Sequence, residues 1–201
     1  KFLEFIKQRQ QYILYVCLAV VIWFGYKIRT ANLSNLIDQA TGKYIMADPD
    51  ALAFLRYAEE ILVNGQMLVN DALRYYPFGF QPGGEFGVLS WIMVYLYKVL
   101  HLFDSSVTLQ YAAVIYPAVA FLFIGIFFFL TVKELFNDEK IALLATAFIA
   151  VIPVFIQRTL SGVSDKEALG TALMMMALYF FVKAWKEEKD VRKGLVFALL
   201  A

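Results

Sequence analysis

The sequence has few of the residues from which disulfide frameworks and soft-ligand metal sites are built. Its 201 residues include one cysteine, Cys17, and one histidine, His101. Cys17 lies inside an apolar run, so a disulfide framework and a Cys/His zinc site are both excluded. His101 stands at the end of another apolar stretch, where packing or snorkelling is the commoner role of a lone histidine.

Charge is also scarce. Charged residues make up 17% of the chain and hydrophobic residues 61%, against about 25% and about 45–50% in soluble domains. The 18 basic and 17 acidic residues give a net charge of +1, which excludes the basic surface typical of nucleic-acid binding. The apolar excess falls in blocks long enough to cross about 30 Å of hydrocarbon. The composition therefore excludes a soluble enzyme and predicts an all-α polytopic membrane protein.

Four apolar runs are predicted to cross the bilayer and a fifth begins near the end of the sequence: residues 11–26, 109–132, 141–157, 168–185 and 194 onward. Because the last run is cut short, we expect the 201 residues to be the N-terminal part of a longer transmembrane domain. The charged N-terminal residues are not followed by a small-residue cleavage site, so a removable signal peptide is not predicted.

Lysine and arginine predict the sidedness, because they concentrate in cytoplasmic segments. Residues 183–193 hold five of them and residues 1–9 hold three. If both segments are cytoplasmic, an even number of crossings separates them, and the four complete spans supply it. The apolar stretch 86–103, which Lys98 interrupts, is then a membrane-associated helix rather than a span. Residues 27–108 form one long external loop.

Within this loop an amphipathic helix is predicted from Pro49 to about residue 64. Leucine and alanine recur there at helical spacing, and Gly65 is a plausible C-terminal stop. The expected apolar face consists of Leu52, Leu55, Ala58 and Leu62. Residues 74–84 follow as a turn-rich stretch, of the kind in which binding residues are often placed.

The first acidic segment, residues 48–50, is Asp-Pro-Asp. The ordinary interpretation is helix capping, with Asp48 as N-cap, Pro49 at the first helical position and Asp50 in the first turn. The second acidic segment, residues 158–167, follows the third span and ends in Ser-Asp-Lys-Glu. Here too capping is the ordinary interpretation, because Ser164 and Glu167 have the spacing of a capping box.

The combination of the two acidic segments points beyond capping. On the predicted topology Asp50, Arg158, Asp165 and Glu167 all lie on the external side near membrane level, where ionisable groups are costly and tend to be functional. Three carboxylates against one guanidinium favour a divalent cation with hard oxygen ligands, Mg²⁺ or Mn²⁺ rather than zinc. Asp165 is expected to be a direct ligand, and Glu167 a second ligand only if the following helix starts late.

The second acidic segment resembles a pattern in the second external loop of the catalytic subunit of oligosaccharyltransferase. In that family an arginine precedes an Asp-x-Asp or Asp-x-Glu pair by seven residues, and here Arg158 precedes Asp165 and Glu167. The stretch from Asp50 to Arg56 is similar to the family's first-loop pattern, an aspartate that precedes an arginine within a helix. Residues 76–79, Tyr-Pro-Phe-Gly, resemble a turn-forming stretch farther along that loop.

The resemblance implies a membrane glycosyltransferase of the GT-C type, with its active site on the extracytoplasmic side. Such an enzyme transfers an oligosaccharide from a lipid-linked polyisoprenyl phosphate or pyrophosphate to the asparagine of Asn-x-Ser/Thr in a protein or peptide. The donor, the acceptor and the bilayer are its implied partners. A later acidic ligand and a Trp-Trp-Asp motif of that family are absent from these residues, so the fragment alone is expected to be inactive.

The resemblance also implies roles for individual residues. Asp50 and Asp165 would bind the metal, with Glu167 beside them, and Arg158 would hold the Asp50 region or the donor phosphate. Asp48 stays an alternative to Asp50, although it lies eight residues before an arginine where the family spacing is six. A further group, expected to contact donor or acceptor, consists of Arg56, Tyr75 and Tyr76.

Two other functions stay open. A GT-C enzyme similar to the protein O-mannosyltransferases would also carry acidic residues in its first external loop, but the Arg158 spacing is not expected there. An ion-coupled transporter would use carboxylates as a cation site. Transporters place such groups near mid-membrane on broken helices, whereas these carboxylates flank predicted span ends.

Overall fold

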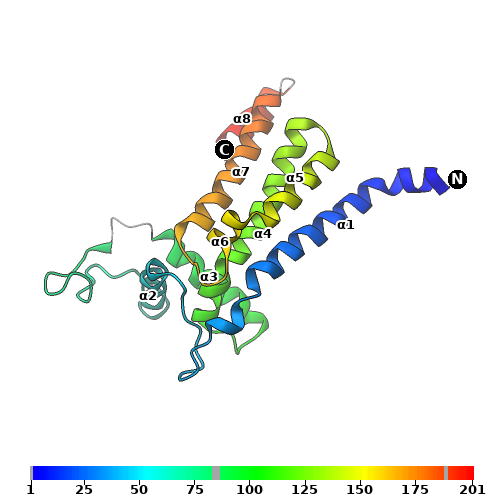
Figure 1. The fold of residues 1–201 in the computed structure, drawn as a ribbon. Helices are drawn as coiled ribbons and strands as arrows, with labels where there is room; N and C mark the ends of the chain where they lie inside the picture. Colours follow the sequence, from blue (N-terminus) through cyan, green and yellow to red (C-terminus); the bar gives the residue numbers. More distant parts are fainter. Residues whose placement is uncertain (1, 83–86, 188–189) are drawn as a thin grey trace. The chain divides into compact units, whose positions relative to one another are not determined.

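The structure is a computed structural model that describes residues 2–82, 87–187 and 190–201, and its regular elements are helices (Figure 1). In chain order they are α1 (Phe2–Thr30), the 3-10 helix η1 (Leu33–Leu36), α2 (Pro49–Asn64), α3 (Val88–Phe103), α4 (Leu109–Phe136), α5 (Glu139–Val151), α6 (Pro153–Thr159), α7 (Lys166–Lys186) and α8 (Val191–Leu200). The first residue of the predicted stretch 86–103 and the end of the turn-rich stretch 74–84 lie outside the described residues.

Among the described residues, three helical segments are long and apolar enough to cross a membrane: Tyr12–Leu36, Leu109–Phe136 and Lys166–Lys186. Helices α5 and α6 pass the same test only as a pair, while α3 is a shorter apolar helix of 16 residues. All four complete spans expected from the sequence are therefore helical. That they cross a bilayer in the predicted order stays a prediction.

The expected span 141–157 is not one uninterrupted helix. It is broken between Val151 and Pro153, and the two parts meet at an angle of 67°. Proline has no backbone N–H and disfavours a helical conformation in the residue before it. Accordingly Ile152 is extended, with φ −65° and ψ 122°. The break thus follows from a local signal that the hydropathy pattern does not contain.

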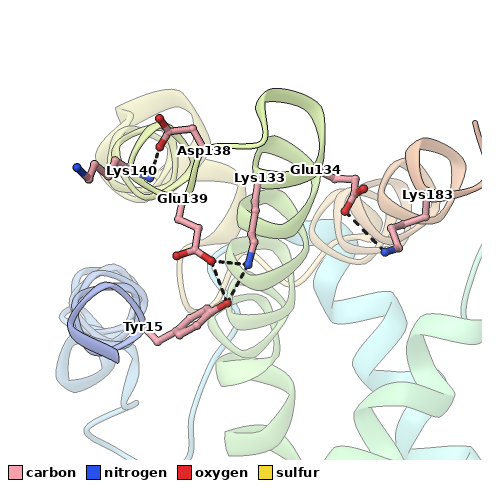
Figure 2. A network of polar contacts seen from close by, with 7 residues as sticks. All are labelled: Tyr15, Lys133, Glu134, Asp138, Glu139, Lys140 and Lys183. Carbon is pink, nitrogen blue, oxygen red and sulfur yellow. Dashed lines mark hydrogen bonds and ion pairs between the residues drawn. The ribbon is translucent and has the colours of Figure 1, made fainter. Parts of the chain in front are cut away.

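The chain forms two compact units. The long-helix unit contains Lys1–Arg29, Val119–Arg158 and Gly170–Ala201, and the loop unit contains Thr30–Ala118 and Thr159–Leu169. In the long-helix unit α4 and α5 form a hairpin that a polar network holds at its turn (Figure 2). Lys133 on α4 donates to Glu139 on α5 at 2.6 Å and to the Tyr15 hydroxyl of α1 at 2.9 Å, while Lys183 of α7 pairs with Glu134 at 3.7 Å.

In the loop unit α2 packs on α3. The residues of α2 that are buried are Ala51, Phe54, Leu55, Tyr57, Ala58 and Ile61. The predicted apolar face is therefore partly wrong, because Leu55 and Ala58 are buried whereas Leu52 and Leu62 are exposed. The face of α2 that packs on α3 carries Phe54, and it is rotated by about one residue from the predicted face. At the contact the Ser90 hydroxyl donates to the Phe54 carbonyl at 2.9 Å.

Candidate active site

The first acidic segment begins α2 as a capped helix start. Asp48 is extended, and its Oδ1 accepts a hydrogen bond from the backbone N–H of Asp50 at 2.8 Å, with Pro49 at the first helical position. Gly65 ends the helix with φ +73° and donates its N–H to the Ile61 carbonyl. The capping role predicted for Asp48 is confirmed, and this leaves Asp50, which is exposed in the first turn, as the carboxylate available for a ligand.

Glycine 162 joins the second acidic segment to the residue before Asp48. Its N–H donates to the Val114 carbonyl of α4 at 2.9 Å, and its carbonyl accepts from the Ala47 N–H at 3.0 Å. Gly162 has φ +91°, and a Cβ added there would lie 2.8 Å from Leu36 Cδ1 and 3.3 Å from Ala47 Cβ. Only glycine suits both this conformation and this close approach. The two acidic segments thus meet through their backbones.

Three more hydrogen bonds hold the second acidic segment inside the loop unit. Asn32 donates its side-chain N–H to the Ser161 carbonyl at 2.9 Å. The Ser164 hydroxyl donates to the Ala113 carbonyl at 2.6 Å, and the Tyr116 hydroxyl donates to the Asp165 carbonyl at 3.3 Å. The segment is correspondingly buried, and its acidic member Asp165 is only 8% exposed.

Asp165 directly precedes α7, and its Oδ1 accepts from the backbone N–H of Lys166 at 2.6 Å, with the Lys166 ammonium 3.6 Å away. The Ser164 hydroxyl, expected in a capping box, instead donates to the Ala113 carbonyl of α4. Glu167 lies in the first turn of α7. Because the helix does not start late, the condition under which Glu167 would be a second direct ligand is not met.

The acidic side chains of the predicted metal site do not form a three-member cluster in the described part of the chain. Within residues 2–82, 87–187 and 190–201, no group of three Asp, Glu, His or Cys side chains lies close enough to hold a metal ion. Of the predicted ligands, Asp165 bonds to the first N–H of its own helix, and Asp50 is exposed to solvent. Arg158 lies exposed in the last turn of α6, in the long-helix unit, and its approach to the carboxylates stays a prediction.

Arg56 makes an ion pair inside the loop unit, and its expected contact with donor or acceptor stays a prediction. Its Nη2 lies 2.5 Å from Oδ1 of Asp71, a residue with 0% exposure, and the same oxygen accepts from the Leu73 N–H at 3.0 Å. A second arginine, Arg74, donates to the Tyr57 hydroxyl of α2. Sequence reasoning missed Asp71 and Arg74, because each finds its partner 15 or more residues away.

These two arginine contacts fasten the stretch that carries the predicted aromatic contacts to α2. Asp71 and Phe80 also pair as an antiparallel bridge, which closes the stretch as a loop. At its tip Tyr75 and Tyr76 are 71% and 83% exposed. Large exposed aromatic side chains on an anchored loop are suited to binding a partner. Their predicted role in donor or acceptor binding is compatible with this exposure and stays a prediction.

Most of the chain is similar in sequence to known proteins of one family. The family described as oligosaccharyl transferase STT3, N-terminal, matches residues 13–201. A dolichyl-phosphooligosaccharide-protein glycotransferase of Methanococcus voltae is 26% identical over 94% of this chain, which covers 23% of the relative. The STT3 subunit of the Saccharomyces cerevisiae dolichyl-diphosphooligosaccharide–protein glycosyltransferase is 41% identical over 54 residues, which are 27% of this chain and 7% of that subunit. The chain thus spans less than a quarter of the length of these relatives.

Solved structures of an Archaeoglobus fulgidus oligosaccharyltransferase share the fold. One, in complex with zinc and sulfate, has a TM-score of 0.72 and 23% identity over 90% of this chain and 23% of that chain. Another, named AglB, in complex with an inhibitory peptide and a dolichol-phosphate, has a TM-score of 0.74 and 22% identity over 94% of this chain and 23% of that chain. The fold is that of a GT-C integral membrane protein. The chain belongs to the STT3 family of oligosaccharyltransferases, and its match is to the N-terminal part of that family.

Proposed function

We propose that the whole protein transfers an oligosaccharide from a lipid-linked polyisoprenyl phosphate or pyrophosphate to the asparagine of Asn-x-Ser/Thr. In this reaction the bond between the sugar and the phosphate oxygen breaks, a bond to the amide nitrogen forms, and the amide loses a proton. The observation that carries the proposal is the bond between Ala47 and Gly162, which joins the two acidic segments of a chain that matches the STT3 family over residues 13–201.

Asp50 and Asp165 are the proposed ligands of a divalent cation, and Glu167 lies beside them. Their oxygens suit a hard ion in kind, and the buried Asp165 is held in place by its own helix and by Tyr116. Two carboxylates do not complete a site, so the remaining ligands would come from the rest of the protein. We propose Mn²⁺ or Mg²⁺; the zinc in the A. fulgidus crystal makes Zn²⁺ the competitor to test.

The proposed site uses two positive groups, the metal ion and Arg158, to stabilise negative charge on the donor. A bound divalent cation would supply Lewis-acid stabilisation of the departing phosphate. Arg158, in the last turn of α6, is the proposed partner of the donor phosphate, because a guanidinium forms bidentate bonds with phosphate oxygens. A fixed cationic group that faces developing negative charge is among the largest single contributions to catalysis.

The proposed partners are of the same kinds as the molecules bound in related structures. The A. fulgidus AglB structure contains an inhibitory peptide and a dolichol-phosphate, and a structure of an A. fulgidus oligosaccharyltransferase contains a tethered acceptor peptide with the NVT sequon. For this chain we propose that Tyr75 and Tyr76 contact donor or acceptor. The proposed active site faces the extracytoplasmic side, opposite the basic residues 183–193. A cysteine at exposed Thr41, in a Cys17→Ser background, should then react with an impermeant maleimide added outside intact cells.

The test uses the full-length protein with a lipid-linked glycan and a fluorescent Asn-x-Thr peptide. Asp165→Asn should lower the rate of transfer by roughly 10²–10³-fold, the usual effect of removing one electrostatic stabiliser. Asp104→Asn is the matched control, because Asp104 is an exposed aspartate after α3. Chelation should stop transfer, and Mn²⁺ or Mg²⁺ should restore it better than Zn²⁺. Metal-independent transfer, or a fully active Asp165→Asn variant, would contradict the proposal.

A further inference from the structure

Arg29 is a fully buried arginine near the end of an apolar helix. Its exposure is 0%, although only 11% of the most apolar part of its span is buried. A charged side chain in or near a membrane span is costly and normally faces protein, where it has a task. The contacts of Arg29 within the long-helix unit indicate what that task is.

The guanidinium of Arg29 connects α1 to two other parts of the long-helix unit. Nη1 donates to the Gly25 carbonyl of its own helix and to the Ala150 carbonyl of α5, both at 2.9 Å. Its Cζ lies 3.6 Å from the centre of the Phe121 ring on α4 and 5.4 Å from that of Phe155 on α6. Stacking on aromatic faces and donation to carbonyls are both contacts that an arginine makes well.

The carbonyl of Ala150 belongs to the break between α5 and α6. The last carbonyls of a helix lack intrahelical donors and need others. The α-helical donor for Ala150 would be the Val154 N–H, but the backbone bonds at this break run from the Phe155 and Ile156 N–H groups to the Ile152 carbonyl. Arg29 supplies the donor for Ala150 on one side of the break, and its ring contact with Phe155 lies on the other side. It therefore touches both arms of the 67° bend.

Close approach of α1 makes these contacts possible. A Cβ added to Gly25 would lie 2.5 Å from Phe121 Cε1 and 3.2 Å from Ala150 Cβ. Small residues allow helix backbones to approach in membranes. Gly25 is thus the position at which α1, α4 and α5 meet, and Arg29 extends from the next turn of α1 into that contact.

We propose that Arg29 is a positioning residue that holds the bend between α5 and α6 and thereby sets the direction in which α6 presents Arg158. The inference rests on the proposed function, in which Arg158 binds the donor phosphate. Arg29 itself does not touch the reacting atoms. It acts by fixing the direction of the short helix α6, which carries the proposed phosphate-binding residue Arg158 in its last turn.

The first test measures the bend without any activity. In a Cys17→Ser background, spin labels at exposed Leu144 on α5 and exposed Val154 on α6 report the distance across the break. The full-length parent should give one narrow distance distribution. Arg29→Met should shift or broaden it, and Arg29→Lys, which keeps a charged donor, should restore much of the narrow peak. Lys27→Met, an exposed cation on the same helix, is the matched control and should change nothing.

The second test measures transfer by the same full-length variants. Arg29→Met should raise KM for the lipid-linked donor by about tenfold or more and leave KM for the peptide unchanged, a selectivity that general destabilisation does not produce. In an Arg158→Met background the same substitution should add little, because both act through one guanidinium.

The two tests separate the possible failures. An unchanged distance distribution in Arg29→Met, or an additive effect with Arg158→Met, would overturn the role of Arg29 while the proposed function stands. Absence of glycan transfer by the parent protein would overturn the proposed function, and the spin-label distances would still decide whether Arg29 holds the bend. If Arg29→Met does not fold, Phe155→Leu, which removes the ring that contacts both Arg29 and Phe121 and keeps the Arg29 hydrogen bonds, should give the same donor-selective change in smaller measure.

Discussion

Each of the two acidic segments places an aspartate at the start of a helix, but the two aspartates differ in their exposure to solvent. Asp50 is exposed in the first turn of α2, while Asp165 is 8% exposed and belongs to a loop that bonds to α4 and to Ala47. The fold thus holds the proposed metal-binding side chain of Asp165 firmly before an ion binds and leaves that of Asp50 in solvent. Changes around Asp165 should accordingly affect stability and activity together, whereas changes at Asp50 should affect activity alone.

The largest effect on stability is expected at the ion pair between Arg56 and Asp71, which involves α2 but not Asp50. Arg56→Met would leave the buried carboxylate of Asp71 without its partner, and breaking such a pair costs about 3–5 kcal/mol. Thermal and denaturant unfolding in detergent would measure the loss. The double variant Arg56→Met/Asp71→Leu should recover most of it. If Arg56→Met were stable and instead raised KM for the donor, the original ligand-contact role would be the correct one.

A smaller loss is expected from Gly162→Ala. The left-handed backbone and the contacts with Leu36 and Ala47 together should lower the free energy of unfolding by about 2 kcal/mol or more. Gly42→Ala is the matched control, because Gly42 has φ +69° but nothing within 4 Å of an added Cβ, so it should lose only about 1 kcal/mol of backbone strain. Equal losses in the two variants would show that the close approach between the acidic segments contributes nothing.

The first segment itself should separate its two aspartates. Asp48→Ala removes a helix cap, which costs about 1 kcal/mol, and should leave transfer nearly intact. Asp50→Asn should leave the melting temperature unchanged and abolish transfer. Both melting and transfer rates are measured on the full-length protein. The reverse pattern would make Asp48 the metal ligand.

The smallest effect concerns the exposed turn before the first segment. A hydrogen bond from the Thr41 hydroxyl, followed by one from the Ala40 N–H, lowers the pKa of Asp38 below its ordinary value of 3.8. A lowered carboxyl pKa contributes stability above the ordinary value, and this is lost as pH falls through the lowered value. Melting temperatures of parent and Asp38→Asn should therefore differ slightly above pH 4 and converge in stronger acid. A difference that grows in acid would have the wrong sign.

Local signals predicted much of this molecule. The cap at Asp48, Pro49 at the first helical position and the stop at Gly65 define α2 within a few residues, and apolar length defines the long helices. Pro153 was a local signal as well, although the span was expected to continue through it.

The remaining features depend on partners far apart in the sequence. Neither the pairing of Arg56 with Asp71 nor the bond from Ala47 to Gly162 follows from spacing, because only packing selects the partner. The buried state of Arg29 is of the same kind, since a lone cation at a span end is ordinarily assigned to the interface. The membership of the candidate site therefore stays a prediction from the sequence, while the structure shows how firmly the fold holds each proposed residue.

The most direct measurement is Mn²⁺ binding to the full-length protein by electron paramagnetic resonance, with Asp50→Asn, Asp165→Asn and the double variant compared with the parent. If both carboxylates bind one ion, each single substitution should weaken binding nearly as much as the double substitution does. Unchanged Mn²⁺ affinity in either single variant, or two independent losses that add in the double variant, would contradict a shared cation.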